Sequence, residues 1–281
     1  MNNIDLKIIA TEVRKCILDE VYLAKSGHPG GSLSIADLLT FLYFEEMNIN
    51  PEQPLLYERD KFILSKGHSA PALYAVLAIK GYFRKDELLN LRKYNSFLQG
   101  HPCMINTPGV DMSTGSLGQG LSVACGMALG NKMNNLENRV YCLCGDGEIE
   151  EGQIWEAAMF AGYRKLNNLC LIIDNNNLQI DGKLEAVCSP YPIDKKFEAF
   201  NFNTINIDGH NFDEIRNAFK LAKKCNDKPT CIIMKTIKGK GVSFMENNPT
   251  WHGKAPNEEE YTIAINELNK ISSDLEDKNV L

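Results

Sequence analysis

An aspartate between two glycines follows an apolar run in the second half of the chain. Residues 140–144 read VYCLC, and Gly145, Asp146 and Gly147 come next. Glycines let the backbone turn sharply and approach a ligand, while a carboxylate at the end of a buried strand is costly without a partner. Residues 175–177, three asparagines, end the next apolar run at 169–174. Carboxylate and amide oxygens are hard ligands that suit a divalent cation. A plain tight turn would explain the GDG sequence alone, but the asparagines at the next strand end favour a metal that holds a phosphorylated ligand.

Four of the five histidines lie in loops that contain glycine or proline, at His28, His68, His101 and His252. Imidazole gains and loses a proton near neutral pH, so it can act as a general acid or base and can stabilise an alkoxide. One such histidine is more often an ordinary surface residue, but four near strand ends predict a polar pocket. His210, which precedes a predicted helix, better fits a structural or interface role.

The elements that must position these residues alternate between strands and helices. Short, continuous apolar runs predict strands at 62–65, 140–144, 169–174, 202–207 and 230–235, and helical spacing predicts helices at 72–80, 118–133, 151–165 and 212–224. Continuous runs are typical of strands buried on both faces. We therefore expect an α/β fold with a mostly parallel central sheet and helices on both faces, and such sheets bind ligands beyond the carboxyl ends of their strands.

The first 46 residues predict two helices separated by a breaker. Apolar positions recur at helical spacing over residues 4–24, and the sequence SGHPGG at 26–31 ends this helix. We expect Ser34 to be the N-cap of the second helix, with Asp37 three residues later, and this helix to run to about Glu46. Residues 99–120, rich in Gly, Pro, Ser and Thr, predict a long functional loop.

Composition excludes several classes of protein. The chain has 281 residues, a net charge of -6 and 44% hydrophobic residues, which are ordinary globular proportions. Without a basic tract we expect no nucleic-acid partner, and without about 18 consecutive apolar residues we expect no membrane span. The N-terminus has no secretory pattern. Nine cysteines show no paired spacing, which favours a reducing compartment and a cytoplasmic location.

Several blocks of sequence resemble the transketolases, a family of thiamine diphosphate-dependent enzymes, and they occur in that family's order. The blocks are SGHPGG (26–31), SKGH (65–68), GHP (100–102), STGSLGQG (113–120), GDGEIEEG (145–152), IDGH (207–210), KTIKGKG (235–241) and WHG (251–253). The resemblance covers roughly residues 5–256. It implies the thiamine diphosphate-binding fold, with a diphosphate-binding domain at 1–256 and a C-terminal helix and tail at 257–281.

The resemblance also implies roles for individual residues. Asp146 and Asn176, through their side chains, and Leu178, through its carbonyl, would bind Mg²⁺ or Ca²⁺, and the amide of Gly147 would approach the diphosphate. Other expected cofactor contacts are His68, Gly115, Ser116, Leu117, Ile237 and His252. The implied reaction transfers a two-carbon ketol unit between sugar phosphates, as in the pentose phosphate pathway. His28, His252, His101 and His68 would serve the substrate's hydroxyl and carbonyl oxygens.

Transketolases that resemble this sequence usually carry three domains on about twice this length, so we expect a partner chain. Full-length enzymes more often have a proline at position 116, and the sequences GSLGQG and WHGKAP resemble the two-chain form of the enzyme. The expected partner is the C-terminal subunit with the pyrimidine-binding domain, in an α2β2 heterotetramer. Glu151 would lie at the subunit interface, or on a solvated helix N-terminus. Activity on a non-standard sugar and a non-catalytic cofactor-binding homologue are the open alternatives; a deoxyxylulose-phosphate synthase fits the blocks less well.

Overall fold

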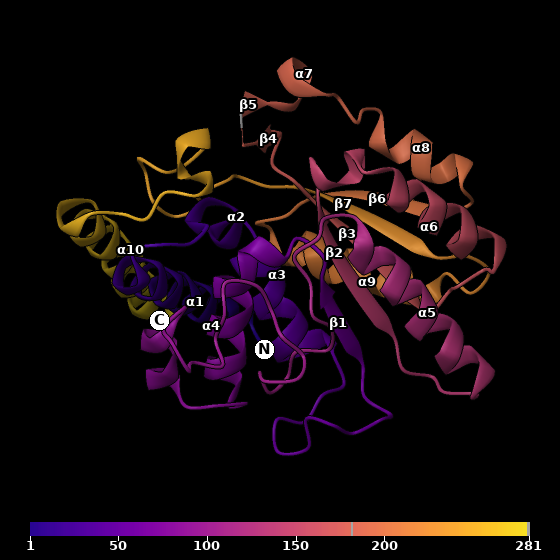
Figure 1. Ribbon diagram of the computed structural model, residues 1–281, viewed down its shortest axis with the longest axis horizontal. Helices are drawn as coiled ribbons and strands as arrows, with labels where there is room; N and C mark the ends of the chain where they lie inside the picture. The colour runs from indigo at the N-terminus through magenta and orange to yellow at the C-terminus, as the bar shows by residue number, and fades with distance from the viewer. Residues whose placement is uncertain (181, 280–281) are drawn as a thin grey trace.

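Five parallel strands form the centre of the molecule, which a computed structural model describes over residues 1–180 and 182–279 (Figure 1). In sheet order they are β1 (Lys61–Leu64), β2 (Val140–Gly145), β3 (Leu169–Asn175), β7 (Thr230–Lys235) and β6 (Asn203–Asp208). Their carboxyl ends share one edge, because Gly145 is in register with Asp174 and Asn175 with Lys235. This arrangement confirms the predicted α/β fold and brings the GDG and NNN sequences to neighbouring strand ends.

Helices cover both faces of this sheet. One face packs on α1 (Asn3–Ala24), α3 (Ala36–Phe41), α4 (Ala70–Lys80) and α9 (Phe212–Lys224). The other packs on α5 (Gln119–Met133), α6 (Gly152–Tyr163) and α8 (Ile193–Ala199). Successive strand residues point to opposite faces, so Tyr141 and Leu143 lie in the first core whereas Cys142 and Cys144 lie in the second. Both faces are apolar, which explains the continuous hydrophobic runs of the strands.

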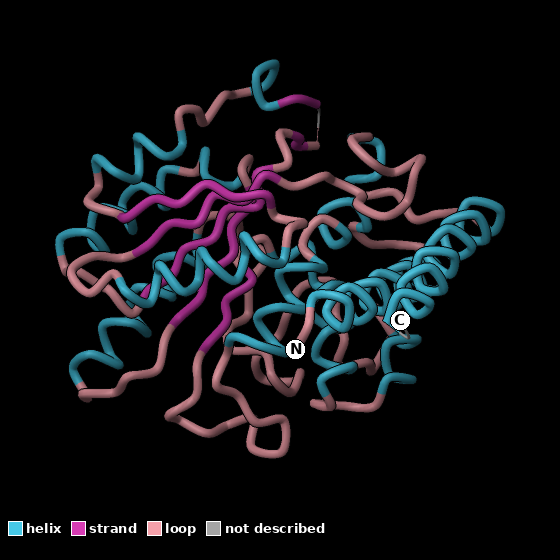
Figure 2. The backbone as a smooth tube through the Cα atoms, turned by 180° about the vertical axis from the view of Figure 1, so that it is seen from behind, coloured by secondary structure: helices cyan, strands magenta, loops and turns pink. Residues whose placement is uncertain are grey.

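The last helix lies alongside the first. Helix α10 (Glu258–Asn279) runs beside α1, as Figure 2 shows from behind. The rings of Tyr22 and Tyr261 stack with centroids 4.2 Å apart, and the Tyr261 hydroxyl donates to Asp19 at 2.6 Å. The helix expected within residues 257–281 is therefore present, and residues 280 and 281 lie outside the described part of the chain.

The segment after α1 differs from the prediction. Ser34 is not the N-cap of a long helix, because the chain already turns into a short helix, α2 (Pro29–Leu33), before α3 and a π-helical turn, η1 (Leu42–Glu46). Proline suits the first position of a helix, where no N–H is needed. The Ser34 hydroxyl instead donates to the buried carboxylate of Asp174 at 2.7 Å. A residue expected to cap a helix thus fixes a side chain beneath the sheet edge.

Short elements complete the fold near the sheet's carboxyl edge. They are the hairpin β4 (Leu178–Gln179) and β5 (Gly182–Lys183), helix α7 (Leu184–Val187), and the 3-10 turns η2 (Gly67–Ser69), η4 (Glu148–Glu150) and η5 (Pro249–His252). A further 3-10 turn, η3 (Lys85–Asn90), packs on α1 and α4. Within the described residues, no helix combines the length and apolar character needed to cross a membrane.

Candidate active site

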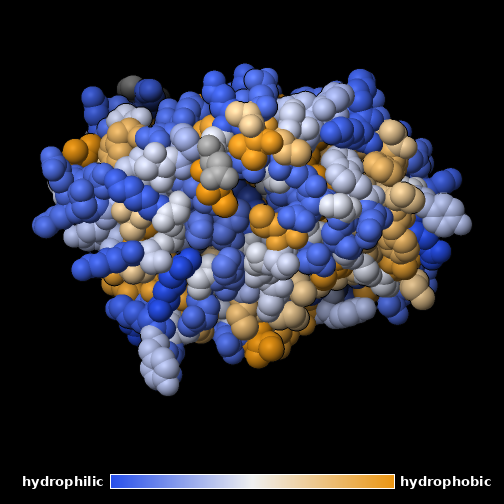
Figure 3. All heavy atoms as spheres, turned by 45° about the horizontal axis from the view of Figure 1, so that its top comes forward, coloured by the Kyte–Doolittle hydropathy of each residue, from blue (hydrophilic) through white to orange (hydrophobic). Residues whose placement is uncertain are grey.

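A pocket of about 260 Å³ opens at the carboxyl edge of the sheet. Figure 3 shows this face hollowed at its centre, with hydrophilic residues in the hollow and hydrophobic residues on its rim. The lining comes from strand ends and the loops that follow them: His28, Gly31, Lys66, His68, His101, Gly115, Leu117, Gly145, Asp146, Gly147, Glu148, Asp174, Asn176, Leu178, Gln179, Ile180, Lys238 and His252. The pocket therefore brings together all four loop histidines and all three of the expected metal-binding residues.

The oxygens of Asp146, Asn176 and Leu178 suit a hard cation. Asp146 is 2% exposed, and burial together with the neighbouring carboxylate of Asp174 raises its pKa to about 7. Its oxygens accept from the amides of Gly147 (2.9 Å) and Asn177 (2.5 Å), and among the described residues no cationic side chain lies within ion-pair distance of it. A divalent cation would relieve this unfavourable charge. Among the described residues no group of three His, Cys, Asp or Glu side chains could hold a metal, so a ligand would have to supply further oxygens.

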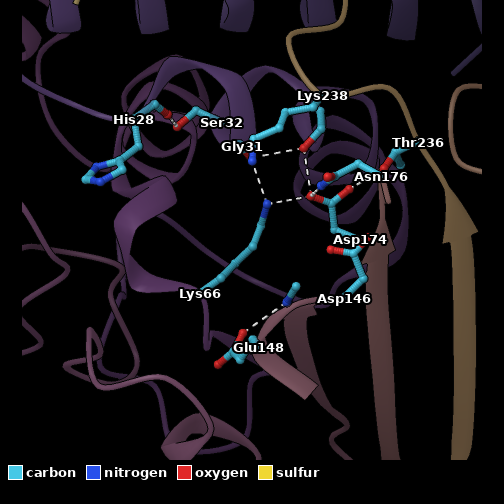
Figure 4. Close-up of polar contacts among 12 residues, drawn as sticks. His28, Gly31, Ser32, Lys66, Asp146, Glu148, Asp174, Asn176, Thr236 and Lys238 are labelled. Carbon is cyan, nitrogen blue, oxygen red and sulfur yellow. Dashed lines mark hydrogen bonds and ion pairs between the residues drawn. The ribbon is translucent and has the colours of Figure 1, made fainter. Parts of the chain in front are cut away.

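Asp174 anchors a buried polar network under the pocket that the sequence analysis missed. Its carboxylate accepts from Lys66 Nζ at 2.6 Å, Ser34 Oγ at 2.7 Å and Asn176 Nδ2 at 3.1 Å, and also from Thr236 (Figure 4). Burial opposes ionisation of Asp174, but the Lys66 ammonium and these hydrogen bonds outweigh it and lower its pKa. The bond from Asn176 Nδ2 fixes the amide, whose oxygen accepts from the Leu178 amide at 3.1 Å and keeps one lone pair for a cation. An aspartate inside the apolar run of β3 was the sequence signal for this network.

Lys238, rather than Ile237, lines the pocket. Its ammonium donates to the Leu178 carbonyl at 3.2 Å and lies 3.1 Å from His252 Nδ1. Burial and the nearby Lys66 lower the pKa of Lys238 to about 8. Ile237, the expected apolar contact, lines a neighbouring hollow with His210 and Lys240, and its amide donates to His210 Nε2 at 2.9 Å. His210 also contacts Asp37 at 2.7 Å, which places it in a structural network outside the pocket.

Three of the histidine rings form a compact triangle. The ring centroids of His28, His68 and His252 are 5.2 to 5.3 Å apart. Burial, followed by the charge of Arg92, lowers the pKa of His28 to about 4, and burial with Lys238 lowers that of His252 to about 3. Burial lowers the pKa of His68 as well. At neutral pH these rings are uncharged, so each offers one N–H donor and one nitrogen acceptor.

The backbone of the 113–120 loop passes close to the ring of His101. A Cβ added at Gly115, whose φ is +146°, would lie 3.0 Å from the His101 ring. Leu117 lines the pocket and is 36% exposed, whereas Ser116 is exposed and does not line it. His101 is the shallowest of the four histidines, and burial lowers its pKa too. The loop thus presents its backbone, with Leu117, at the mouth of the pocket.

A close backbone contact also holds α2 against the 3-10 turn η5. A Cβ at Gly30 would lie 2.8 Å from the carbonyl oxygen of Trp251, so only glycine fits. Trp251 is buried, its ring packs against Phe244, and it directly precedes His252. The backbone two residues after His28 thus lies against the backbone that precedes His252.

Exposed hydrophobic residues extend from the pocket mouth over α5 and α6. Glu151, the expected interface residue, is exposed at the start of α6. Beyond it Met159, Phe160 and Tyr163 are 59%, 41% and 82% exposed, and Met133 at the end of α5 is 73% exposed. Hydrophobic residues gather on the right of Figure 3, on the side where α5 and α6 lie in Figure 1. We call Leu117, Met133, Met159, Phe160 and Tyr163 the α5/α6 patch.

Comparison with known proteins gives a consistent result. A family model described as "Transketolase, thiamine diphosphate binding domain" matches residues 5–270. The chain is 48% identical over 267 residues to a 6-deoxy-6-sulfo-D-fructose transketolase subunit of Clostridium sp. (strain MSTE9), covering 95% of this chain and 97% of that protein. It is 41% identical over 274 residues to an apulose-4-phosphate transketolase subunit of Phocaeicola vulgatus, covering 98% and 97%.

The similarity extends to solved structures of longer proteins. The crystal structure of transketolase from Campylobacter jejuni superimposes with a TM-score of 0.90 at 36% identity, covering 96% of this chain and 43% of that one. This chain thus spans less than half of that single-chain protein, whereas it spans nearly all of the two relatives named as subunits.

Proposed function

The chain belongs to the transketolase family through its thiamine diphosphate-binding domain, and from this premise we propose that it is the N-terminal subunit of a two-chain transketolase. The enzyme would transfer a two-carbon ketol unit from a ketose phosphate, or a ketose with another anionic group, to an aldose. The observation that carries the proposal is that Asp146, Asn176, Leu178 and four histidines line one pocket at the sheet edge. We assign residues 1–256 to the diphosphate-binding domain and the remainder to the C-terminal helix.

The pocket residues fit thiamine diphosphate and a divalent cation. Asp146, Asn176 and the Leu178 carbonyl would hold Mg²⁺ or Ca²⁺ between protein and diphosphate, and the amide of Gly147 would approach the phosphates. The expected cofactor contacts in the pocket lining are His68, Gly115, Leu117 and His252. Ser116 and Ile237 lie outside this lining, and we propose that they contact the cofactor from its edge. When bound, the cofactor supplies a nucleophilic carbon and an electron sink for cleaving the bond between C2 and C3 of the ketose.

The uncharged histidines would manage the protons of this reaction. Cleavage requires that the donor's C3 hydroxyl lose a proton, and transfer requires that the acceptor's aldehyde oxygen gain one. His28 and His252 lie 5.3 Å apart by ring centroids, so one sugar oxygen can reach both rings. Neutral imidazole can accept the first proton and return it later, and His68 and His101 would orient the C1 and C2 oxygens.

A partner subunit would complete the site. We propose that the pyrimidine-binding chain packs on the α5/α6 patch, with Glu151 at the interface, and that two copies of each chain form an α2β2 assembly in the cytoplasm. The patch supports this proposal because large exposed apolar side chains on two adjacent helices beside a pocket are typical of interaction surfaces. Leu117 belongs to both the patch and the pocket lining, so the partner would reach the cofactor directly.

The names of the relatives suggest which sugars to test as substrates, and no more than that. The relatives named above act, by their names, on 6-deoxy-6-sulfo-D-fructose and on apulose 4-phosphate, and these sit beside the pentose phosphate pair of xylulose 5-phosphate and ribose 5-phosphate. The anionic end of a sugar would contact the partner more than this chain. We therefore leave the sugar open between a standard and a non-standard ketose.

The deciding experiment is co-purification with the candidate C-terminal subunit, followed by ketol transfer assays. Each panel donor is tested with and without thiamine diphosphate and Mg²⁺. Turnover that needs both chains, the cofactor and the metal supports the proposal, and the preferred donor identifies the sugar. Full turnover by this chain alone contradicts the two-chain assignment. A stable complex that binds no cofactor favours a non-catalytic homologue.

A further inference from the structure

Glu148 is a buried carboxylate that joins three loops of the pocket. It is 3% exposed, and in the described part of the chain no cation lies within ion-pair distance of it. Its Oε1 accepts from the Gly118 amide at 3.0 Å and from the Ser65 hydroxyl. Its Oε2 accepts from the Gly145 amide at 3.0 Å, the bond drawn from Glu148 in Figure 4. Both oxygens are therefore turned toward the protein, although part of the residue lines the pocket.

Each of the three donors begins or ends a segment that carries predicted site residues. Ser65 follows β1 and leads to Lys66 and His68. Gly118 ends the loop that presents Gly115 and Leu117 and precedes α5. Gly145 ends β2 and precedes Asp146 and Gly147. One carboxylate thus links the segments on the histidine side, the predicted cofactor side and the metal side of the pocket.

The three segments are in close contact at two glycines, where no larger residue fits. A Cβ at Gly120 would lie 2.4 Å from Ser65 Oγ, and one at Gly67 would lie 2.8 Å from the Gly115 amide nitrogen. A buried amide that loses its acceptor costs free energy, and a charged acceptor strengthens each bond. Loss of the carboxylate would leave the buried amide of Gly118 and the half-buried amide of Gly145 without this acceptor and release the loops.

We propose that Glu148 is a positioning residue for cofactor binding in the proposed transketolase. It acts through Ser65, Gly118 and Gly145 by holding their loops in the spacing that accepts the diphosphate and the ring of thiamine. The inference rests on the proposed function. It predicts that Glu148 sets the affinity for cofactor, while the chemical step with cofactor bound depends on the histidines.

The test compares the variants Glu148→Gln and Ser65→Ala, each in the complex of this chain with its pyrimidine-binding partner, and uses the exposed Glu276→Gln on α10 as a matched control. Titration calorimetry gives the Kd for thiamine diphosphate in Mg²⁺, and turnover at saturating cofactor gives kcat and the sugar KM. We expect Glu148→Gln to raise the cofactor Kd at least tenfold with kcat within about threefold of wild type. Ser65→Ala, which leaves both glycine bonds, should raise the Kd less.

A double variant shows whether Glu148 and Ser65 affect cofactor binding together or independently. In the double variant the change in Kd should be smaller than the product of the single changes, because both substitutions affect the same hydrogen bond between Ser65 and Glu148. An unchanged cofactor Kd in Glu148→Gln overturns the inference. If that variant does not fold, Ser65→Ala decides: a raised Kd supports the inference, and a wild-type Kd overturns it. A wild-type complex that binds no thiamine diphosphate overturns the proposed function, and the inference with it.

Discussion

At the scale of single residues, the site depends on buried charges whose partners are neighbours in space and not in sequence. Asp174 is neutralised by Lys66, whereas the hydrogen-bond donors to Asp146 in the described part of the chain are two backbone amides. The difference assigns the two aspartates different tasks. Asp174 holds the buried polar network together, and we expect Asp146 to be the aspartate that binds a cation.

Asp146→Asn tests that assignment. The substitution keeps the size of the side chain but removes the charge that would attract the metal, so we expect thiamine diphosphate to bind at least 100-fold more weakly and to lose its dependence on Mg²⁺. Calorimetric titrations of the complex at several Mg²⁺ concentrations measure this effect. Asp277→Asn, at an exposed position of α10, serves as the control. Retained Mg²⁺ dependence in Asp146→Asn would contradict the metal site.

His28 links the site to the pH dependence of stability. Its pKa is lowered from the ordinary 6.5 to about 4, so protons bind the unfolded chain more strongly than the folded one. The stability it contributes is complete above about pH 6.5 and is lost as the pH falls toward 4. We expect His28→Asn to flatten the decline of the urea midpoint between pH 6.5 and 4. Equal slopes for variant and wild type would show that His28 takes no part.

At the scale of elements, close contacts of glycines set how helices meet their neighbours. In α6 a Cβ at Gly162 would lie 1.8 Å from the Phe200 carbonyl oxygen, whereas in α5 a Cβ at Gly126 would meet open space. The same change in adjacent helices therefore has opposite expected effects.

Gly162→Ala should destabilise the protein by about 2 kcal/mol or more, because the backbone must move away from Phe200. Gly126→Ala should stabilise it by up to about 1 kcal/mol, because alanine is the better helix former. Urea unfolding of both variants beside wild type provides the comparison. Similar midpoints for the two variants would mean that the α6 contact is not rigid.

Much of the fold follows from local sequence patterns, and the exceptions have tertiary causes. Helix α9 and strand β7 begin and end where the sequence predicts them, because their apolar spacing is regular. Helix α2 was missed, since Gly30 and Gly31 disfavour a helix locally and only the surrounding chain shows why side chains cannot fit there. Lys66 and Lys238 are ordinary residues in the sequence, and burial alone shows that they belong to the pocket.

At the scale of the whole molecule, the pocket and the α5/α6 patch meet at Leu117. Asp146, Asn176 and the four loop histidines line the pocket, while the side chains of the patch are exposed in the part of the chain that the structure describes. An assembly would both bury the patch and close the pocket. Assembly and cofactor retention should therefore rise and fall together.

Two matched substitutions test this surface. Phe160 in the patch and Leu221 on α9, across the sheet, are 41% and 43% exposed, so aspartate at either position should cost the isolated fold little. We expect Phe160→Asp to weaken binding of the partner chain at least tenfold and Leu221→Asp to leave it unchanged. Sedimentation of the mixed chains measures both. Equal binding by the two variants would place the interface elsewhere.

The contact between Gly30 and Trp251 holds a tryptophan beside the pocket, where its fluorescence can report ligand binding. The chain has two tryptophans; Trp155 packs against Phe197 and Phe200 on the α8 side, and Trp251 is next to His252 at the pocket. Replacing Trp155 by phenylalanine would leave a single fluorophore beside the site. Its emission would then follow ligand arrival in real time, without a dye and before any sugar has been turned over.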